Sequence, residues 1–493
     1  MKHQLLSVLA AAALLGSGTG CTGDFAEVNT DPNGPVDVPP PSILSGAIQN
    51  VVGGVNGVNS LNIRGGGLWA QYYSQIQYRD EDKYIVRSGT SGGWAFYYGA
   101  LEDAQRMINK GVAANTANWA AVGRILKSYT FSVMTEAMGD LPYSEALLGD
   151  SILSPKYDTQ QSIYNALFVD LKTASDQIDP AGIGFSTGDL MYGGDMDLWR
   201  KFANSLRLRL AVHLSNVDPT KAAAEAQAAV AAGVFESNAD NARLFYLAAN
   251  PNRNPIYNDA RGRDDYGMSK TYVDSLLSWN DPRLPIFAQI NKDTIVAART
   301  YRGLPNGLND GEGDPLFMVS RIGAYWRETA NAPMYLQTYS EVLFLQAEAA
   351  QRGWVAGSAA TLYADAIRAS MEQYGISAAA ITAYLAQPRV QYVAGTGLTQ
   401  IAYQKWVSMF MQGMEAWTEV RRTQVPAIVP GCRAVLRHIP QRLPYEDQEA
   451  VLNKASLDAA VAAQGFAGGN DLTKPLWFTG RTTSVTYPAP PCP

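Results

Sequence analysis

Two aromatic stretches in the first hundred residues carry side chains that suit the binding of a sugar. The rings are Trp69, Tyr72, Tyr73 and Tyr78 in the first stretch and Trp94, Tyr97 and Tyr98 in the second. Rings with a polar handle suit a site that is half wet and half apolar. A sugar offers an apolar C–H face to such a ring and hydroxyls to a nearby Asp, Asn or Arg. Because most rings at helical spacing pack in a core, we expect only a few to face a ligand, led by Trp69 and Trp94, with Tyr78 third.

A loop further along the chain has a similar polar and aromatic mix. It contains Arg261, Arg263, Asp264, Asp265 and Tyr266. The surrounding stretch, about 239–334, is rich in Asn, Asp, Gly and Pro and has few long periodic runs. Loops of this kind often carry the binding function of a protein. We therefore predict a ligand-binding set made of Trp69, Tyr72, Tyr73, Tyr78, Trp94, Arg263, Asp265 and Tyr266.

Signatures of catalysis are sparse in this sequence. Beyond the N-terminal leader the only histidines are His213 and His438, and neither has the spacing of a zinc protease helix. The glycine-rich motifs of nucleotide- and dinucleotide-binding proteins do not occur. Asp140 and Glu145 lie near a predicted helix end, and a pair of carboxylates could flank a glycosidic bond. A surface glycoside hydrolase that uses these two or the loop carboxylates is therefore the alternative to a binding protein.

The other acidic groups have structural explanations. Glu415 and Glu419 lie one helical turn apart and precede Arg421 and Arg422, which indicates an ion network on a helix face. An alternating acidic run resembles a calcium loop, but a proline replaces the glycine expected after the third ligand; the run is Asp310, Glu312, Asp314 and Pro315. We predict no catalytic residue, no metal site and no cofactor.

The N-terminus has the pattern of a secretory signal peptide. Lys2 precedes an apolar run over 5–15 and small residues over 16–20, and Cys21 follows directly. The apolar run is shorter than the roughly 20 residues that span a bilayer, so residues 1–20 are predicted to be removed. Cys21 would then carry the lipid anchor, although Gly18 stands where a lipobox usually has an aliphatic residue. An ordinary cleaved secretory protein is the alternative.

Residues 21–41 lack hydrophobic periodicity and end in three prolines, which favour extended conformations. We interpret them as a tether, and the alternative is an N-terminal arm packed on the domain.

The formal net charge of −6 disfavours phosphate-rich partners, so nucleic acid is not expected.

Besides Cys21, the sequence contains only two cysteines, Cys432 and Cys492. In an oxidising compartment they are a disulfide candidate, with two free thiols as the alternative.

Hydrophobic periodicity predicts helices over most of the chain. The predicted ranges are 93–110, 118–138, 159–178, 197–215, 220–233, 335–352, 358–374 and 400–421, with Gly111 ending the first of them. Residues 345–374 look like a degenerate tetratricopeptide unit. We expect a mostly α fold of irregular tetratricopeptide-like helix pairs, in which 42–493 form one helical domain with a loop-rich insertion at about 239–334. A tetratricopeptide-like adaptor that binds only protein helices is a third possible function.

Several blocks together resemble the SusD/RagB family of nutrient-binding lipoproteins. They are the run from Tyr339 to Ala349, the run from Ile401 to Trp406, the run from Glu415 to Thr423, the run from Arg442 to Tyr445 with Glu449 and Asn453, and upstream the runs from Gly139 to Ala146 and from Asn280 to Leu284. The blocks follow the order and spacing of that family over nearly the whole mature chain.

The resemblance implies a SusD-like fold and a lipid anchor at the surface of the outer membrane. It also implies uptake of oligosaccharides or peptides, with the protein placed over a SusC-like TonB-dependent transporter as its partner. The matching blocks belong to the scaffold of that family, so the resemblance assigns no ligand residue. The expected mechanism is binding followed by transfer to the transporter, with no bond broken.

Overall fold

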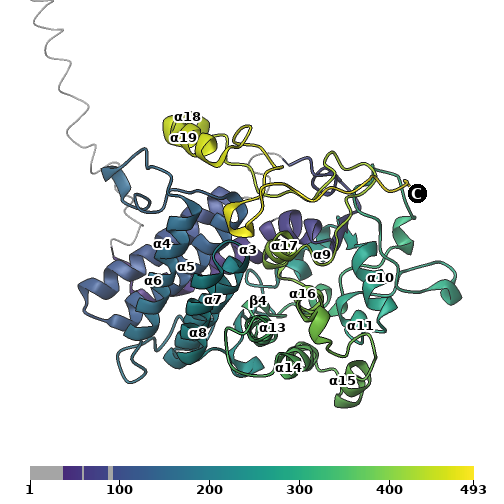
Figure 1. The fold of residues 1–493 in the computed structure, drawn as a ribbon, viewed down its shortest axis with the longest axis horizontal. Coiled ribbons are helices and arrows are strands. Elements are labelled where there is room, and N and C mark those ends of the chain that lie inside the picture. Colours follow the sequence, from purple (N-terminus) through teal and green to yellow (C-terminus); the bar gives the residue numbers. More distant parts are fainter. Residues whose placement is uncertain (1–36, 58–59, 87–92) are drawn as a thin grey trace, which may run out of the picture.

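The computed structural model describes residues 37–57, 60–86 and 93–493, and most of them are helical. An N-terminal group of helices runs back and forth, each packed against the next from α4 to α8, at the left of Figure 1. The group comprises α3 (Pro40–Asn56), α4 (Gly93–Ala113), α5 (Ala117–Met138), α6 (Gln160–Gln177), α7 (Met196–His213) and α8 (Pro219–Ala231).

Small residues let α4 and α5 approach closely. A Cβ on Gly123 would lie 2.8 Å from the carbonyl oxygen of Ala104, and one on Gly111 would lie 2.4 Å from the amide nitrogen of Ala120. The sequence-based expectation that Gly111 ends the first helix is wrong, because α4 continues to Ala113. The glycine is a packing position on the helix, where its missing side chain admits the neighbouring backbone.

A second group of helices is built from the C-terminal part of the chain. It comprises α13 (Tyr339–Gln351), α14 (Ala359–Glu372), α15 (Ala378–Leu385), α16 (Gly397–Ser408), α17 (Gly413–Thr423), α18 (Glu449–Leu452) and α19 (Lys454–Gln464). The tightly packed pair α13 and α14 corresponds to the predicted tetratricopeptide-like unit. Cys432 and Cys492 form a disulfide, with their Cα atoms 5.3 Å apart.

Short elements and loops fill the segment that was predicted to be loop-rich. They are β2 (Ala242–Leu244), α9 (Pro255–Gly262), β3 (Tyr266–Met268), α10 (Lys270–Ser278), α11 (Leu284–Phe287) and α12 (Ala324–Arg327). In the described residues β3 pairs with β1 (Tyr73–Gln75) and β2 pairs with β4 (Met334–Gln337), both antiparallel. This segment shares the main hydrophobic core with the helices, since Tyr272, Phe287 and Trp326 belong to it.

A network of buried charges ties the two helical groups together. His213 at the end of α7 contacts Glu136 of α5 through Nδ1 at 2.7 Å and Glu415 of α17 through Nε2 at 2.9 Å. Arg209 of α7 binds Glu341 of α13 at 2.6 Å. The carboxylates raise the pKa of His213 well above its usual value, against an opposing effect of burial. Both ring nitrogens therefore donate, and His213 is a buried imidazolium.

The remaining members of the network come from α13, α16 and α17. Lys405 binds Glu419 at 2.8 Å, and Arg422 binds both Glu419 at 2.7 Å and Glu348 at 2.6 Å. The sequence predicted an ion network on a helix face for α17. The structure confirms the ion pairs but places them in the core, because α17 is covered on all sides. Such charges need partners when buried, and here each carboxylate has one.

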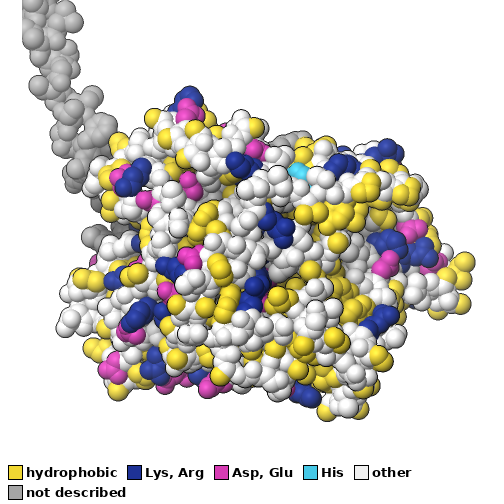
Figure 2. All heavy atoms as spheres, viewed as in Figure 1, with side chains coloured by type: hydrophobic (Ala, Val, Ile, Leu, Met, Phe, Trp, Pro, Cys, Tyr) yellow, Lys and Arg dark blue, Asp and Glu magenta, His cyan; other side chains and the backbone are white. Residues whose placement is uncertain are grey.

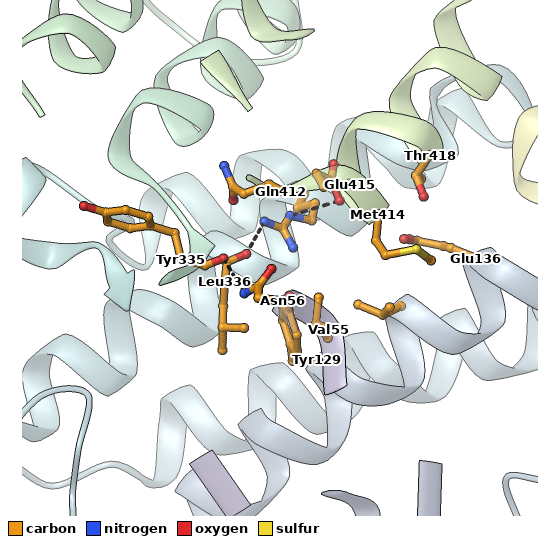
Figure 3. Close-up of a pocket in the computed structure, with 12 residues that line it drawn as sticks. Val55, Asn56, Tyr129, Glu136, Tyr335, Leu336, Gln412, Met414, Glu415 and Thr418 are labelled. Carbon is orange, nitrogen blue, oxygen red and sulfur yellow. Dashed lines mark hydrogen bonds and ion pairs between the residues drawn. The ribbon is translucent and has the colours of Figure 1, made fainter. Parts of the chain in front are cut away.

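The cavity beside this network is too small for a nutrient. It measures about 10 Å³ and is lined in part by Asn56, Glu136 and Glu415, whose side chains approach it from three helices in Figure 3. That volume suits about one water molecule. Glu136, His213 and Glu415 lie close enough together to hold a metal ion, and they also bond to one another within the network.

No helix in the described part of the chain is long and apolar enough to cross a membrane.

Candidate ligand-binding site

Pairing between β1 and β3 brings together the first aromatic stretch and the polar loop. Tyr73 lies opposite Met268, and Gln75 lies opposite Tyr266. One residue beyond the strand, the amide of Ile76 donates to the carbonyl of Asp265 at 2.8 Å. These main-chain bonds hold the ends of the two strands at one place, about 190 residues apart in sequence by their numbering.

A pocket of about 370 Å³ opens where the two strands end. Its lining residues come from both segments and are Arg64, Gln75, Gln77, Tyr78, Asp80, Glu81, Ile85, Arg263, Asp265 and Tyr266. Four of the predicted ligand-binding residues therefore meet in one hollow: Tyr78, Arg263, Asp265 and Tyr266.

Tyr78 presents the exposed ring of the pocket. It is 67% exposed, and its backbone has a φ of 54°, in the left-handed region that few non-glycine residues adopt. The guanidinium of Arg263 lies 5.6 Å from the centre of the ring. Arg263 is held in turn by Asp265, whose carboxylate accepts from Nε at 2.6 Å. An apolar ring face and a fixed set of polar groups thus occupy the same wall.

The floor of the pocket is a second ion pair with an amide attached. Arg64 binds Glu81, and Gln75 Nε2 donates to the same carboxylate at 2.8 Å. The side chain of Glu81 is 6% exposed, whereas that of Arg64 is 31% exposed. Because each carboxylate of Glu81 and Asp265 faces an arginine, the pocket offers hydrogen-bonding groups without a large excess of one charge. Figure 2 shows both signs interspersed among apolar side chains on the face in view.

The position of Arg64 depends on close backbone packing. Arg64 belongs to a π-helical turn over Leu61–Gly67, in which three glycines follow it. A Cβ on Gly66 would lie 2.2 Å from the carbonyl oxygen of Gly413, and one on Gly67 would lie 2.3 Å from that of Asn62. Only glycine fits such an approach. The floor of the pocket is therefore anchored to the first turn of α17.

Three rings of the predicted set lie in the core and not in the pocket. Trp69, Tyr72 and Tyr73 are fully buried. Trp69 packs edge-on against Trp417 with 4.8 Å between ring centres, and Tyr72 stacks on Trp406 at 5.7 Å. The expectation that these rings face a ligand is corrected, because no face of them reaches the surface. They support the turn and strand that carry Gln75 and Tyr78.

Two further predictions fall outside the described residues. The side chain of Trp94 and the whole of Cys21 lie there, so both stay predictions.

Tyr266 lines the pocket but is only 5% exposed. Burial raises the pKa of its hydroxyl, so the group stays neutral and can both donate and accept a hydrogen bond.

Six of the residues that line the pocket were not predicted from the sequence. Asp80 and Glu81 were visible as an acidic run beside the rings, and Arg64 could have been found from the glycines that follow it, since a glycine run marks close backbone approach. Gln75, Gln77 and Ile85 carried no signal that singles them out.

The carboxylates of the hydrolase alternative serve as structural partners. Asp140 accepts a hydrogen bond at 2.8 Å from the amide of Gln160 in the first turn of α6, and burial raises its pKa to about 6. Glu145 accepts from the amide of Lys156 at 2.9 Å. The acidic run that resembles a calcium loop is divided among three arginines: Asp310 faces Arg79, Asp314 faces Arg302 and Glu312 faces Arg433.

Comparison with known proteins identifies the family. A SusD-like family model described as starch-binding, associating with outer membrane, matches residues 32–446. The chain belongs to the SusD-like family. None of the curated proteins matches this sequence. Membership supports a carbohydrate-binding role in nutrient uptake and an association with the outer membrane.

Solved structures agree with the mostly α SusD-like fold. A chitin-binding protein is 31% identical with a TM-score of 0.79, and the match covers 90% of this chain and 100% of that one. A SusD homologue from Bacteroides fragilis is 25% identical with a TM-score of 0.78 over 90% of this chain and 99% of that one. A chitin-binding SusD homologue from Flavobacterium johnsoniae has a TM-score of 0.76 at 24% identity, over 88% and 98%, and shares the fold.

Proposed function

We propose that this SusD-like protein captures neutral oligosaccharides, chitin fragments first among them, in the pocket at Tyr78. The observation that carries the proposal is the meeting of an exposed ring with the paired groups of Arg263 and Asp265 in a hollow of about 370 Å³. The ring can stack on the apolar face of a sugar, while the polar groups bond to hydroxyl and acetamido groups around its edge.

The choice of chitin rests on relatives of this chain. The chitin-binding protein that is 31% identical matches over 90% of this chain. An N-acetylglucosamine unit has no charge, and the pocket pairs its buried carboxylate Glu81 with Arg64 and its half-exposed arginine Arg263 with Asp265. A neutral ligand leaves both pairs intact, whereas a charged ligand would have to compete with one partner of a pair.

The captured sugar would then pass to a SusC-like TonB-dependent transporter, with the protein held at the outer membrane by a lipid on Cys21. Because such a ligand must leave again, we expect binding of moderate strength. A ring that stacks on sugars selects for shape more than for charge. No bond of the ligand is broken in this scheme.

Calorimetry with the full mature chain tests the ligand class. The probes are N-acetylglucosamine oligomers, starch fragments and short neutral peptides at equal concentrations. We expect heat from the N-acetylglucosamine oligomers and the full length of the ligand to be recovered unchanged. Binding of peptides alone, or shortening of the sugar during the titration, would contradict the proposal. Co-purification with a co-expressed SusC-like β-barrel receptor tests the transfer step separately.

A further inference from the structure

A second hollow of about 420 Å³ lies at the N-terminal end of α9. It is formed where the end of α3 meets the segment that runs from β2 into α9, and its lining includes Gln49, Phe245, Leu247, Asn252, Arg253 and Asn258. The pocket at Tyr78 lies by the other end of α9, since Arg263 directly follows that helix. The eight residues of α9 span about 12 Å at 1.5 Å per residue.

Apolar surface and free amides meet in this second hollow. Phe245 is 52% exposed and Leu247 is 57% exposed, which is unusual for two large apolar side chains side by side in a hollow. The guanidinium of Arg243 lies 4.7 Å from the centre of the Phe245 ring and fixes its orientation. The chemistry is that of the first pocket, an accessible ring beside polar groups.

The amides supply the hydrogen-bonding capacity that a sugar needs. The side-chain amides of Gln49, Asn252 and Asn258 all line the hollow. Within the described ranges none of the three has a side-chain hydrogen bond. Each amide carries two donors and one acceptor, so together they can bond to several hydroxyl or acetamido groups without giving up a protein partner.

Arginines also pair with a ring on α9, between the two hollows. Arg253, which lines the second hollow, lies 5.7 Å from the centre of the Tyr257 ring, and Arg261 lies 4.2 Å from it. Arg263, directly after α9, pairs with Tyr78 in the same way in the first pocket. The side chain of Tyr257 is only half-buried, so the surface between the two hollows is also able to contact a sugar chain.

We propose that the hollow at Phe245 is a second sugar subsite, which holds the far end of an oligosaccharide whose other end occupies the pocket at Tyr78. This inference rests on the proposed function. Two sites that a single chain can occupy together bind it more tightly than either alone, because the second contact forms at a high effective concentration. Affinity should therefore rise with chain length until the ligand spans α9.

The test measures affinity by calorimetry for a disaccharide and a hexasaccharide of N-acetylglucosamine. We expect Phe245→Ala to weaken binding of the hexasaccharide about tenfold, which is about 1.4 kcal/mol, because the variant removes the ring that would stack on the far end of the chain. Binding of the disaccharide should weaken by less than about twofold. Phe245→Trp, which keeps a flat ring, should retain the length dependence. Phe317→Ala, at a position that is 45% exposed and lines neither hollow, is the matched control variant.

The outcomes separate this inference from the proposed function. Tyr78→Ala should lower the affinity for both ligands. If it lowers the affinity for neither, the assignment of the first pocket is wrong. If Tyr78→Ala lowers the affinity for both ligands but Phe245→Ala lowers it for neither, the second subsite does not exist, and the assignment of the first pocket remains valid. Equal losses of both ligands in Phe245→Ala would also overturn the second subsite, because a subsite for the far end cannot contribute to a ligand that does not reach it.

Discussion

The ring of Tyr78 and the guanidinium of Arg263 lie 5.6 Å apart, although one follows β1 and the other precedes β3. The main-chain bonds of the two strands set this distance. Arg263 bonds to Asp265 and not to Tyr78, so the ring keeps its position by backbone conformation and stacking. Substitution of Tyr78 therefore tests the stacking of the ring on a sugar, whereas substitution of Arg263 or Asp265 tests the charged pair beside it.

We expect Arg263→Lys to weaken binding of N-acetylglucosamine oligomers by a few-fold. Lysine keeps the charge but loses the planar fork that bonds to Asp265 and lies near the ring. Asp265→Asn should have a similar effect, because it releases the arginine that it holds. Calorimetry of each variant measures the change. Equal affinity in both variants and in the wild type would mean that this wall of the pocket does not contact the sugar.

Gly66→Ala should lower the free energy of unfolding by about 1–3 kcal/mol, the usual cost of forcing extra atoms into a packed place. The new Cβ would meet the carbonyl oxygen of Gly413 at 2.2 Å, and backbone cannot move aside as a flexible side chain can. Gly99→Ala is the matched control, since its Cβ in α4 meets nothing closer than 4.0 Å and should stabilise the helix by roughly 0.5–1 kcal/mol. Urea denaturation compares the two.

His213→Gln should lower the free energy of unfolding by about 3–5 kcal/mol, because it removes the cation between buried carboxylates. The carboxylates of Glu136 and Glu415 raise the pKa of His213 in the folded state, so its stabilisation is complete below the unfolded pKa of about 6.5. It is lost as pH rises through the folded pKa.

The pH dependence distinguishes that ion pair from a simple packing defect. Raising the pH above about 6.5 should reduce the stability of the wild type, and the same change should have less effect on His213→Gln. Glu419 also contacts the ring at 3.1 Å, and Lys405, Arg209 and Tyr164 face the same carboxylates. Parallel pH profiles for the two proteins would show that His213 is neutral when folded.

Cys21→Ser should abolish labelling of the protein by a fatty acid and release it from the membrane fraction. A thioether-linked lipid requires the cysteine sulfur, and each buried CH₂ of an acyl chain contributes about 0.8 kcal/mol to anchoring. Metabolic labelling followed by fractionation measures both effects. Labelling that persists in the variant would place the lipid elsewhere, whereas its absence from the wild type would indicate an ordinary secreted protein.

Sequence reasoning located the two segments of the pocket and both rings that line it, Tyr78 and Tyr266, but it ranked the buried Trp69 above Tyr78. Tyr78 and Trp69 look equivalent in sequence, yet Trp69 is buried by Trp417, 348 positions further along the chain by their numbering. Contacts over such distances decide which side of a ring is free, and local spacing does not record them. The glycines after Arg64 mark a close backbone approach in the sequence, but its partner Gly413, which Gly66 contacts, is distant in the chain and was not predictable.

The helical scaffold was more accessible to prediction because its signals are local. Periodicity located α5 to within one residue at its start, but it failed at Gly111, because a glycine can end a helix or pack inside one. It was also wrong over 335–337, which belong to β4, and over 400–421, where α16 ends at Ser408 and α17 begins at Gly413. The buried position of the ion network on α17 was not predictable from spacing. Residues one turn apart with opposite charges occur on exposed and buried faces alike, and only partners such as His213 and Glu348 distinguish the two.

The pairing of β1 with β3 has a consequence for how this protein could change its cargo. Main-chain hydrogen bonds between Tyr73–Gln75 and Tyr266–Met268 hold the two walls in place, and every residue type except proline can supply them. The side chains at positions 78 and 263 project from that frame and carry no part of the core. If the proposed site is correct, mutation at these two positions would change which sugar is recognised at little cost to folding.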